Sequence, residues 1–547
     1  MRRWICVCAL LGACGGGGGE GDAALDAPAV VDAAGPRDWP AAEVPAVTEP
    51  EPGIRREVLT LEGHPAPPNP STGDATPDAL DRVQVVRYSG MDEPDVRAVV
   101  VAMPGIFGGA GSFDPLARNM VRRSLADAPI EVWVIDRRSN LLEDLRGLDA
   151  AEASGDADIA RGYYFGGETV GGERFEGFRS QEDVPYMSEW GLETHLEDLR
   201  RVIERVPAER VFLMGHSLGA SMTEAFAAWR FGSVRGAELV AGLILVDGAA
   251  GTSPLTETEY REGTSGGFMA VPGVDAIRSS TRYLALPLLG VEVYLRAEIA
   301  AMDALWAPDE VRVDRGRAMV LSTLMSIPVG RLPPMTNAGA FGFAFDDQSN
   351  GLSFAAVGMG RPTGGPVEPY ESLFGSTLER PSDSNATYDW IDARDVDPPE
   401  LTPLANLAHS WIDGRTNFAE WYFPVRLTLD LAAVGGLAVD PDGWQAEAGL
   451  RAFDGALVDA PILAVAAALA PAERYEAVRA RAAPVGDGRP NAGATRDEAS
   501  GFSVVDASAQ THIDPLSAAD VPENPVPGAV LEFVYGNAAG GRVPLVP

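Results

Sequence analysis

The chain of 547 residues contains no lysine, so all 43 of its basic residues are arginine. Against them stand 79 aspartate and glutamate residues, and the formal net charge is −36. We expect so acidic a chain to be repelled by nucleic acid and by anionic lipid, which argues against nucleic-acid binding. The acidity favours solubility and does not indicate a fold.

Cysteine is nearly absent as well. Only Cys6, Cys8 and Cys14 occur, all before residue 15. The remaining chain therefore has no internal disulfide, no thiolate metal site and no cysteine nucleophile. The five histidines are scattered, and none belongs to an HExxH or comparable ligand pattern. This spacing argues against a catalytic zinc site, and we expect no metal or other cofactor.

Residues 1–13 are typical of a secretory signal peptide. Two arginines precede an apolar run at residues 4–11, which is too short to span a bilayer, and small residues follow. The sequence LGAC at residues 11–14 resembles the lipobox of bacterial lipoproteins, which implies cleavage before Cys14 and its acylation. The alternative is an ordinary secretory signal with an incidental cysteine. We expect an exported protein, anchored by lipidated Cys14 to the bacterial cell envelope at the outer membrane.

Composition and hydrophobic patterning divide the rest of the chain. Residues 14–53 contain almost no large apolar residue, and we expect a flexible acidic linker. Strand-like runs with helical patterns between them predict an α/β fold with a doubly wound, mostly parallel sheet of about eight strands. The runs lie at residues 56–63, 81–90, 96–105, 131–138, 210–217, 241–248, 460–470 and 501–508, and residues 529–536 look like a closing element.

Residues 252–454 interrupt this pattern. They hold long apolar helical stretches at residues 276–306 and 317–327, and glycine-rich loops dotted with aromatic residues. We interpret them as a large, mainly helical cap inserted between two parts of the core, residues 54–251 and 455–547. The many Leu, Met, Phe and Trp residues of the cap suggest an apolar group on the substrate, although the same residues would also pack helices together.

The sequence GHSLG at residues 215–219 fits the pattern G-x-S-x-G. A serine at the tip of a sharp strand-to-helix turn takes a strained backbone conformation, and the two glycines avoid clashes across that turn. A buried-type strand ends at Gly215 and a helix with a small-residue face follows. We therefore predict that Ser217 is a nucleophile and that the N–H of Leu218 binds an oxyanion. The alternative is a serine that caps the helix.

The order of elements and the GHSLG sequence resemble the α/β-hydrolase superfamily, and serine esterases and lipases in particular, over about residues 55–250 and 455–547. The resemblance implies a second oxyanion donor in the loop after the strand at residues 96–103. In that loop Ile106 would give its N–H, with Phe107 the next candidate. Residues 136–140, DRRSN, resemble a turn of the family, to which we assign a structural role.

The chain order of the catalytic triad in this fold is serine, acid, histidine, which implies a late histidine as the base. His512 lies in a loop after the last buried strand, where it would take the proton of Ser217 and later protonate the leaving group. Three other histidines are weaker candidates. His216 lies inside the GHSLG turn, His195 on an amphipathic helix and His409 in the cap.

The acid has two candidates. The family usually carries it after the strand at residues 460–470, where this chain has only alanine and leucine, and Glu473 is the first carboxylate beyond. Some members carry it after the strand that follows the serine helix, where this chain has Asp247. We favour Asp247 and keep Glu473 as the alternative. Asp506 is closer to His512 in sequence but lies on a strand, not in its loop.

These residues together predict a serine hydrolase that acts on a small-molecule carboxylic ester, with an apolar group, through an acyl-enzyme. Amide cleavage, carbon–carbon bond cleavage and acyl transfer stay open, because a fold does not set its substrate. A non-catalytic, surface-anchored binding protein is a further alternative. The missing acid after residues 460–470 supports it, whereas GHSLG and His512 argue against it.

Overall fold

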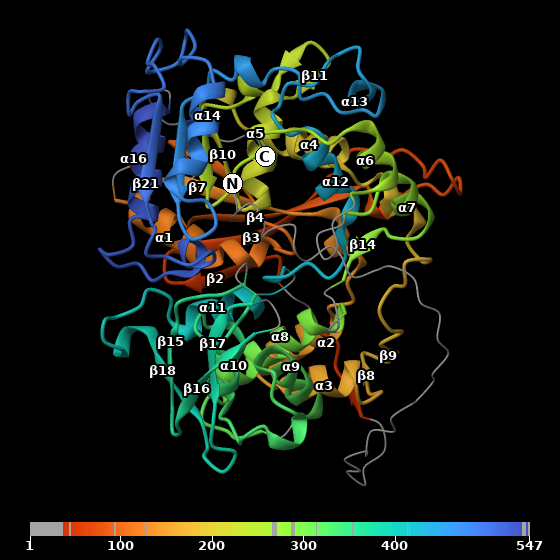
Figure 1. Ribbon diagram of the computed structural model, residues 1–547, viewed down its shortest axis with the longest axis vertical. Helices are drawn as coiled ribbons and strands as arrows, with labels where there is room; N and C mark the ends of the chain where they lie inside the picture. Colours follow the sequence, from red (N-terminus) through yellow and green to blue (C-terminus); the bar gives the residue numbers. More distant parts are fainter. Residues whose placement is uncertain are drawn as a thin grey trace.

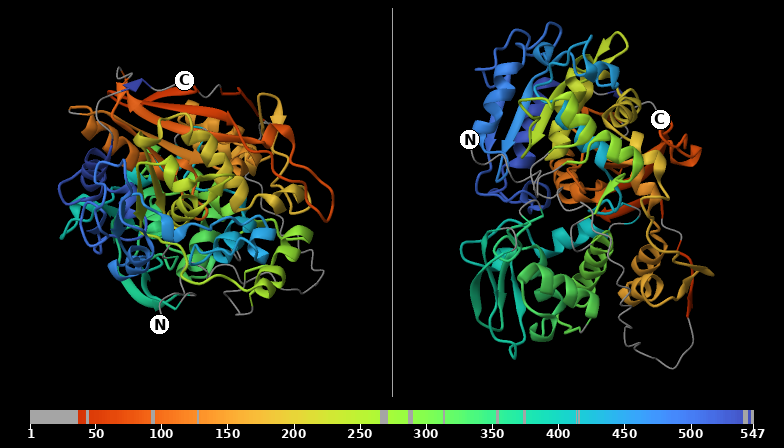
Figure 2. Two further views of the ribbon diagram at one scale, coloured as in Figure 1. Left: turned by 90° about the horizontal axis from the view of Figure 1, so that it is seen from above. Right: turned by 45° about the vertical axis from the view of Figure 1, so that its right-hand side comes forward.

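A computed structural model of the protein describes residues 37–42, 45–91, 95–126, 128–264, 271–285, 290–312, 314–352, 355–372, 375–412, 414, 416–538 and 543–544. The predicted signal peptide, Cys14 and most of the predicted linker lie outside these residues. The described part of the linker contains β1 (Asp38–Trp39) and β2 (Val47–Glu51), so the prediction of a flexible segment is wrong there. The described chain forms an upper part built around a large sheet and a lower part of helices and hairpins (Figures 1 and 2). Among the described helices, none combines the length and the apolar character that crossing a membrane requires.

The upper part is organised by a nine-stranded sheet in the order β2-β3-β4-β7-β6-β10-β13-β20-β21. The pairings from β7 to β21 are parallel, and those from β2 to β7 are antiparallel. This strand order is that of the α/β-hydrolase fold, which confirms the predicted fold class. The strands are β2 (Val47–Glu51), β3 (Ile54–Glu62), β4 (Arg82–Gly90), β6 (Ala98–Met103), β7 (Ile130–Asp136), β10 (Val211–His216), β13 (Gly242–Val246), β20 (Ile462–Ala466) and β21 (Phe502–Asp506).

Both faces of the central strands are covered, which explains why their sequences are continuously apolar. In β10, Val211 and Leu213 enter the core shared with α4 (Leu192–Ile203) and α5 (Leu218–Ala228). Phe212 and Met214 enter the opposite core, shared with α1 (Asp114–Ser124) and α16 (Val526–Asn537). The closing element expected at residues 529–536 is thus a helix, α16, that covers the sheet.

The apolar stretch at residues 276–306 is divided in the structure. It forms the end of α7 (Val274–Ser279), the two-residue strand β14 (Tyr283–Leu284) and α8 (Glu292–Trp306). Gly290, with a φ of 67°, lies just before α8 in a conformation that a helix excludes. The sequence pattern predicts one apolar helical stretch over residues 276–306, and the structure corrects this to two helices with a short strand between them.

The insertion between β13 and β20 contributes to both parts of the molecule. Helices α6 (Glu257–Glu262), α7 and α12 (Val425–Ala433) lie in the upper part, where α12 packs on α4. The lower part, called the cap from here on, is joined by α2 (Arg146–Ser154) and α3 (Ala157–Tyr164), which precede the insertion. Its other elements are α8, α9 (Arg315–Met325), α10 (Asn337–Phe345), α11 (Leu404–Ile412), β15 (Gly360–Thr363), β16 (Val367–Glu371), β17 (Thr377–Pro381) and β18 (Asp389–Asp392).

Candidate active site

Ser217 lies on a strained turn between β10 and α5. Its backbone has φ 56° and ψ −120°, a combination that costs a non-glycine residue about 1–3 kcal/mol. Two hydrogen bonds hold the turn. The Ser217 N–H donates to the carbonyl of Val246 on β13 at 2.9 Å, and the Ser217 carbonyl accepts from Ala220 at 3.0 Å. These bonds to the neighbouring strand and to the first turn of α5 thus hold Ser217 in its strained backbone conformation.

Three glycines make this turn sterically feasible. A Cβ on Gly215 would lie 2.0 Å from the Gly219 carbonyl oxygen, and one on Gly219 would lie 2.1 Å from the Met103 carbonyl oxygen. Both distances are far inside van der Waals contact, so both positions require glycine, as the sequence pattern indicates. Gly248 is the third, since a Cβ there would lie 2.2 Å from the Ser217 carbonyl oxygen. Only the structure reveals this contact, because Gly248 belongs to a different strand end.

The structure brings His512 and Asp247 together. His512 lies between β21 and α15 (Asp514–Ser517), and its Nδ1 is 2.6 Å from Oδ2 of Asp247, directly after β13. The two residues are only 2% and 1% exposed. With Nδ1 engaged by the carboxylate, Nε2 is the nitrogen left to exchange a proton. Glu473, the other candidate acid, is exposed on the 3-10 helix η11 (Ala472–Tyr475).

The loop after β20 has no acidic residue where the family usually carries one, but its backbone binds the carboxylate of Asp247. The N–H of Leu469 lies 3.1 Å from both carboxylate oxygens of Asp247, and the N–H of Ala470 donates to Oδ1 at 2.6 Å. Burial raises the pKa of Asp247, but the hydrogen bond and charge of His512 and these N–H donors outweigh it, so the net pKa lies below the ordinary value. Asp247 is therefore ionised and able to stabilise a protonated His512.

His216 supports the His512 loop from inside the serine turn. Its Nε2 lies 2.8 Å from the backbone carbonyl of His512, and the two ring centroids are 4.3 Å apart. Burial, followed by the charge of His512, lowers the pKa of His216 to about 3. The ring is therefore neutral, and its Nε2–H donates to the carbonyl. His216 thus positions the loop and does not serve as a base.

The loop after β6 runs against the serine. A Cβ on Gly105 would lie 3.0 Å from the Cβ of Ser217. Ile106 and Ser217 line one cavity, and the N–H groups of Ile106 and Leu218 donate to no acceptor within the described part of the chain. Both are thus available to an oxyanion, as the sequence predicts for these two positions. Phe107 follows with a φ of 58°, a second strained backbone position next to the candidate nucleophile.

Arg137 holds this loop from behind. The guanidinium is buried and donates to the carbonyls of Pro104 at 2.5 Å, Gly105 at 2.9 Å and Gly108 at 2.9 Å. Because a trans peptide directs its C=O and N–H to opposite sides, the bond to the Gly105 carbonyl turns the Ile106 N–H away from Arg137. Arg137 therefore orients the very peptide that would bind the oxyanion.

The insertion between β13 and β20 supplies the partner of Arg137. Oε2 of Glu420 lies 2.6 Å from Nη1 of Arg137, its Oε1 bonds the hydroxyl of Ser139, and its N–H donates to the Phe107 carbonyl at 2.8 Å. Phe418 accepts a further hydrogen bond from the same loop, from the Gly109 N–H at 2.7 Å. The sequence predicts a structural role for residues 136–140, but it predicts neither residue of this ion pair as part of the site. No local signal links them, because they are 283 positions apart.

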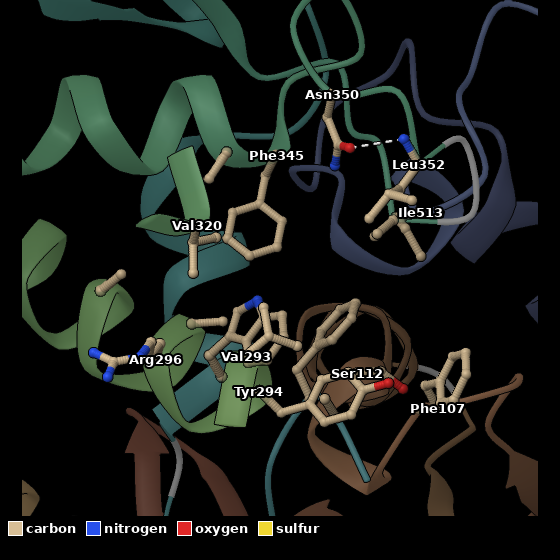
Figure 3. Close-up of a pocket in the computed structure, with 18 of the residues that line it drawn as sticks. Phe107, Ser112, Val293, Tyr294, Arg296, Val320, Phe345, Asn350, Leu352 and Ile513 are labelled. Atoms are coloured by element: carbon tan, nitrogen blue, oxygen red, sulfur yellow. Dashed lines mark hydrogen bonds between the residues drawn. The ribbon is translucent and has the colours of Figure 1, made fainter. Parts of the chain in front are cut away.

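A cavity of about 1140 Å³, counted out to open solvent, extends from Ser217 into the cap. Ser217, His512, Ile106 and Phe107 line one end, and the walls beyond are mainly apolar. Figure 3 shows the rings of Tyr294 and Phe345 along the cavity, and Arg296 at the end away from Phe107. The faces of α8 and α9 contribute Val293, Ala297, Ala300, Val320, Leu321 and Leu324.

The remaining histidines lie away from this cavity. His195 is buried on α4, where Nδ1 lies 2.7 Å from the Gly191 carbonyl, and His409 lies on α11. Neither lines the cavity. Within the described ranges, no three histidine, cysteine, aspartate or glutamate side chains are grouped as metal ligands would be.

No protein-family model and no curated protein matches this sequence. Three solved structures illustrate what the chain is similar to. They are a candidate lipase from Sulfolobus solfataricus (11% identity, TM-score 0.43, covering 91% of this chain and 98% of that one), a peroxisomal α/β-hydrolase from Saccharomyces cerevisiae (10%, 0.37, 91% and 93%) and a thermophilic esterase from Thermogutta terrifontis (12%, 0.33, 88% and 98%). The fold assignment rests on the strand order, and scores this low add nothing to it.

Proposed function

We propose that the protein is a serine hydrolase that cleaves carboxylic esters through an acyl-enzyme on Ser217. The observation that carries the proposal is the buried His512–Asp247 pair, placed so that His512 lines the same cavity as the strained Ser217. A structural serine has no need of a strained turn that requires three glycines. A histidine that acts as a general base likewise requires a buried, ionised carboxylate hydrogen-bonded to its other ring nitrogen.

In the first half of the reaction, Ser217 Oγ attacks the ester carbonyl carbon while Nε2 of His512 takes the hydroxyl proton. The carbonyl oxygen becomes an oxyanion, which the N–H groups of Leu218 and Ile106 stabilise. Asp247 stabilises the imidazolium that forms. When the tetrahedral intermediate collapses, the bond to the alcohol oxygen breaks, and His512 returns the proton to the leaving alkoxide.

The second half repeats these steps with water as the nucleophile. His512 removes a proton from water, the hydroxide adds to the acyl carbon, and the proton then passes to Ser217 Oγ as the carboxylic acid departs. The largely apolar walls of the cavity support an apolar acyl or alcohol group on the ester. Because fold and triad geometry are shared by several reactions, amide cleavage, acyl transfer and carbon–carbon cleavage are the alternatives at the same site.

A fluorophosphonate probe tests the nucleophile directly. We expect it to label the wild type, to leave Ser217→Ala unlabelled and to label Ser112→Ala, a control whose serine lines the same cavity. An unlabelled wild type, or equal labelling of Ser217→Ala, would support the non-catalytic alternative and overturn the proposal. A panel of p-nitrophenyl esters of increasing acyl length, beside the matching p-nitroanilides, then separates ester from amide cleavage.

A further inference from the structure

Large exposed apolar side chains are concentrated at one end of the molecule. Nine are present in the described chain, and five of them belong to the cap or directly follow its helices. Exposed apolar residues are ordinarily scattered singly, so a concentration marks an interaction surface. These five residues, called the cap apex, are Phe165, Trp306, Val311, Met319 and Val329.

The apex residues lie on elements that contact one another. Phe165 follows α3, Trp306 ends α8, Met319 lies on α9 and Val329 begins the 3-10 helix η8 (Val329–Arg331). α3 contacts α8, α8 contacts α9, and α9 contacts η8. Figure 1 shows α3, α8 and α9 together at the lower end of the molecule, opposite β11 (Arg230–Phe231). The apex is therefore one region and not a set of remote positions.

Residues 306–331, which carry four of the five apex residues, are less acidic than the rest of the chain. Residues 306–331 contain four arginines against three carboxylates, whereas the whole chain has a net charge of −36. Trp306 is a residue type that membrane interfaces favour, because its ring is apolar and its N–H is polar. Arg315 and Arg331 are exposed in the same segment, and guanidinium groups suit phosphate. Exposed apolar side chains, a tryptophan and arginines together fit the headgroup region of a lipid bilayer.

The chain before the described residues joins the molecule at the same end. β1 (Asp38–Trp39) pairs with β8 (Thr169–Val170), which contacts α2 and α3. Between the predicted acylation site Cys14 and Arg37 there are 22 residues, numbers 15 to 36. A glycine-rich chain of that length has an end-to-end distance of roughly 25 Å. An anchor at Cys14 would therefore hold the α3 end of the molecule close to the membrane.

We propose that the cap apex docks on the surface of a lipid bilayer. Helix α9 then separates the bilayer from the cavity, because Val320, Leu321 and Leu324 line the cavity while Met319 is 56% exposed. An ester dissolved in the bilayer would reach Ser217 through the cap with its apolar part already out of water. This uptake step rests on the proposed hydrolase function, whereas the docking itself does not.

Vesicle sedimentation tests the docking. The full chain carrying Cys14→Ser, which removes the predicted anchor, is mixed with phosphatidylcholine vesicles. We expect it to bind, and we expect the added pair Trp306→Ser and Met319→Ser to lower the partition coefficient at least fivefold. The matched control is Val234→Ser with Leu457→Ser, on β12 (Val234–Arg235) and the 3-10 helix η10 (Gly455–Leu457), because these side chains are similarly exposed, at 37% and 49%, but belong to the upper part.

Equal binding by the apex pair and the control pair would overturn the docking proposal, as would the absence of binding to phosphatidylcholine. So would binding that requires phosphatidylglycerol and disappears at high salt, since insertion of apolar side chains is not screened by salt. Matching thermal unfolding midpoints of the two variant pairs verify that both are folded.

Hydrolysis supplies the second readout. We expect the apex pair to slow cleavage of a long-chain ester embedded in the vesicles and to leave cleavage of soluble p-nitrophenyl acetate unchanged. Equal loss on both substrates would contradict uptake from the bilayer. Failure of the fluorophosphonate to label Ser217 would overturn the hydrolase function while leaving vesicle binding intact, so the two proposals fail separately.

Discussion

The edge of the core sheet and the cap enclose one cavity but contribute to it by different physical means. At the sheet edge, hydrogen bonds fix each candidate catalytic residue, as the N–H groups of Leu469 and Ala470 do for Asp247. In the cap, the side chains of α8 and α9 provide apolar volume and few polar contacts. The core therefore positions the candidate catalytic residues and the cap sets the space of the cavity, except at Arg137, which holds the loop after β6 and is paired with Glu420 of the insertion.

The largest expected effect lies in the core. Asp247→Asn places a neutral amide against Nδ1 of His512, which favours the wrong tautomer and leaves the imidazolium unstabilised. We expect kcat/KM on p-nitrophenyl butyrate to fall about 10³- to 10⁴-fold. Glu473→Gln is the matched control, with an expected change within about twofold because the residue is exposed. A larger loss for Glu473→Gln than for Asp247→Asn would show that Glu473 is the acid.

The second prediction concerns a buried carboxyl group of the core, that of Asp136 at the end of β7. Asp136 is fully buried, accepts hydrogen bonds from the Ala110 N–H and from Asn140, and burial raises its pKa to about 7. The folded state therefore holds the proton more tightly than the unfolded state, and the wild type loses stability as pH rises from about 4 to about 7.

Asp136→Asn cannot ionise, so its stability relative to the wild type should increase with pH. Between pH 5 and pH 8 we expect a relative gain of about 2–3 kcal/mol in the free energy of unfolding, measured by urea denaturation at both pH values. An offset from the wild type that is the same at both pH values would mean that Asp136 does not titrate in this range.

The third prediction concerns the contact between Arg137 and Glu420, through which the insertion would support the proposed catalysis. Arg137→Gln should release the Gly105–Ile106 peptide and lower kcat about 10- to 100-fold, less than outright removal of an oxyanion donor. KM for a short soluble ester should change little, because Arg137 lies behind the loop and outside the cavity lining. Arg137→Lys should restore part of kcat. An equal fall in thermal stability for both variants without any difference in kcat would indicate a purely structural role.

The smallest expected effect lies in the cap alone. Ala300→Phe adds a ring inside the cavity and should lower kcat/KM for p-nitrophenyl dodecanoate about tenfold, while p-nitrophenyl acetate changes less than about twofold. Thr323→Phe, on the same pair of helices but outside the cavity lining, is the control. A parallel loss on both esters would show that this part of the cap affects the chemistry and not only the available space.

Sequence patterns predict the core well because its information is local. A strand covered on both faces must be apolar at every position, and this gives the strands around β10 directly from composition. The serine turn is equally local, since Gly215, Ser217 and Gly219 lie within five residues. The cap is harder to predict from sequence patterns. Residues 276–306 look like one helical stretch in the sequence but form the end of α7, β14 and α8, and Gly290 lies before α8 in a conformation that a helix excludes.

The sequence by itself determined the fold class and the place of the candidate nucleophile, and it reduced the acid to two residues. Tertiary structure decided which of them meets His512, because residues 247 and 512 come together only when β13 and the loop after β21 reach the same sheet edge. It also decided that Glu420 reaches Arg137 and that five exposed apolar residues share one end of the cap. The reason is physical: hydrophobic periodicity is set by near neighbours along the chain, whereas a site is assembled by contacts between residues hundreds of positions apart.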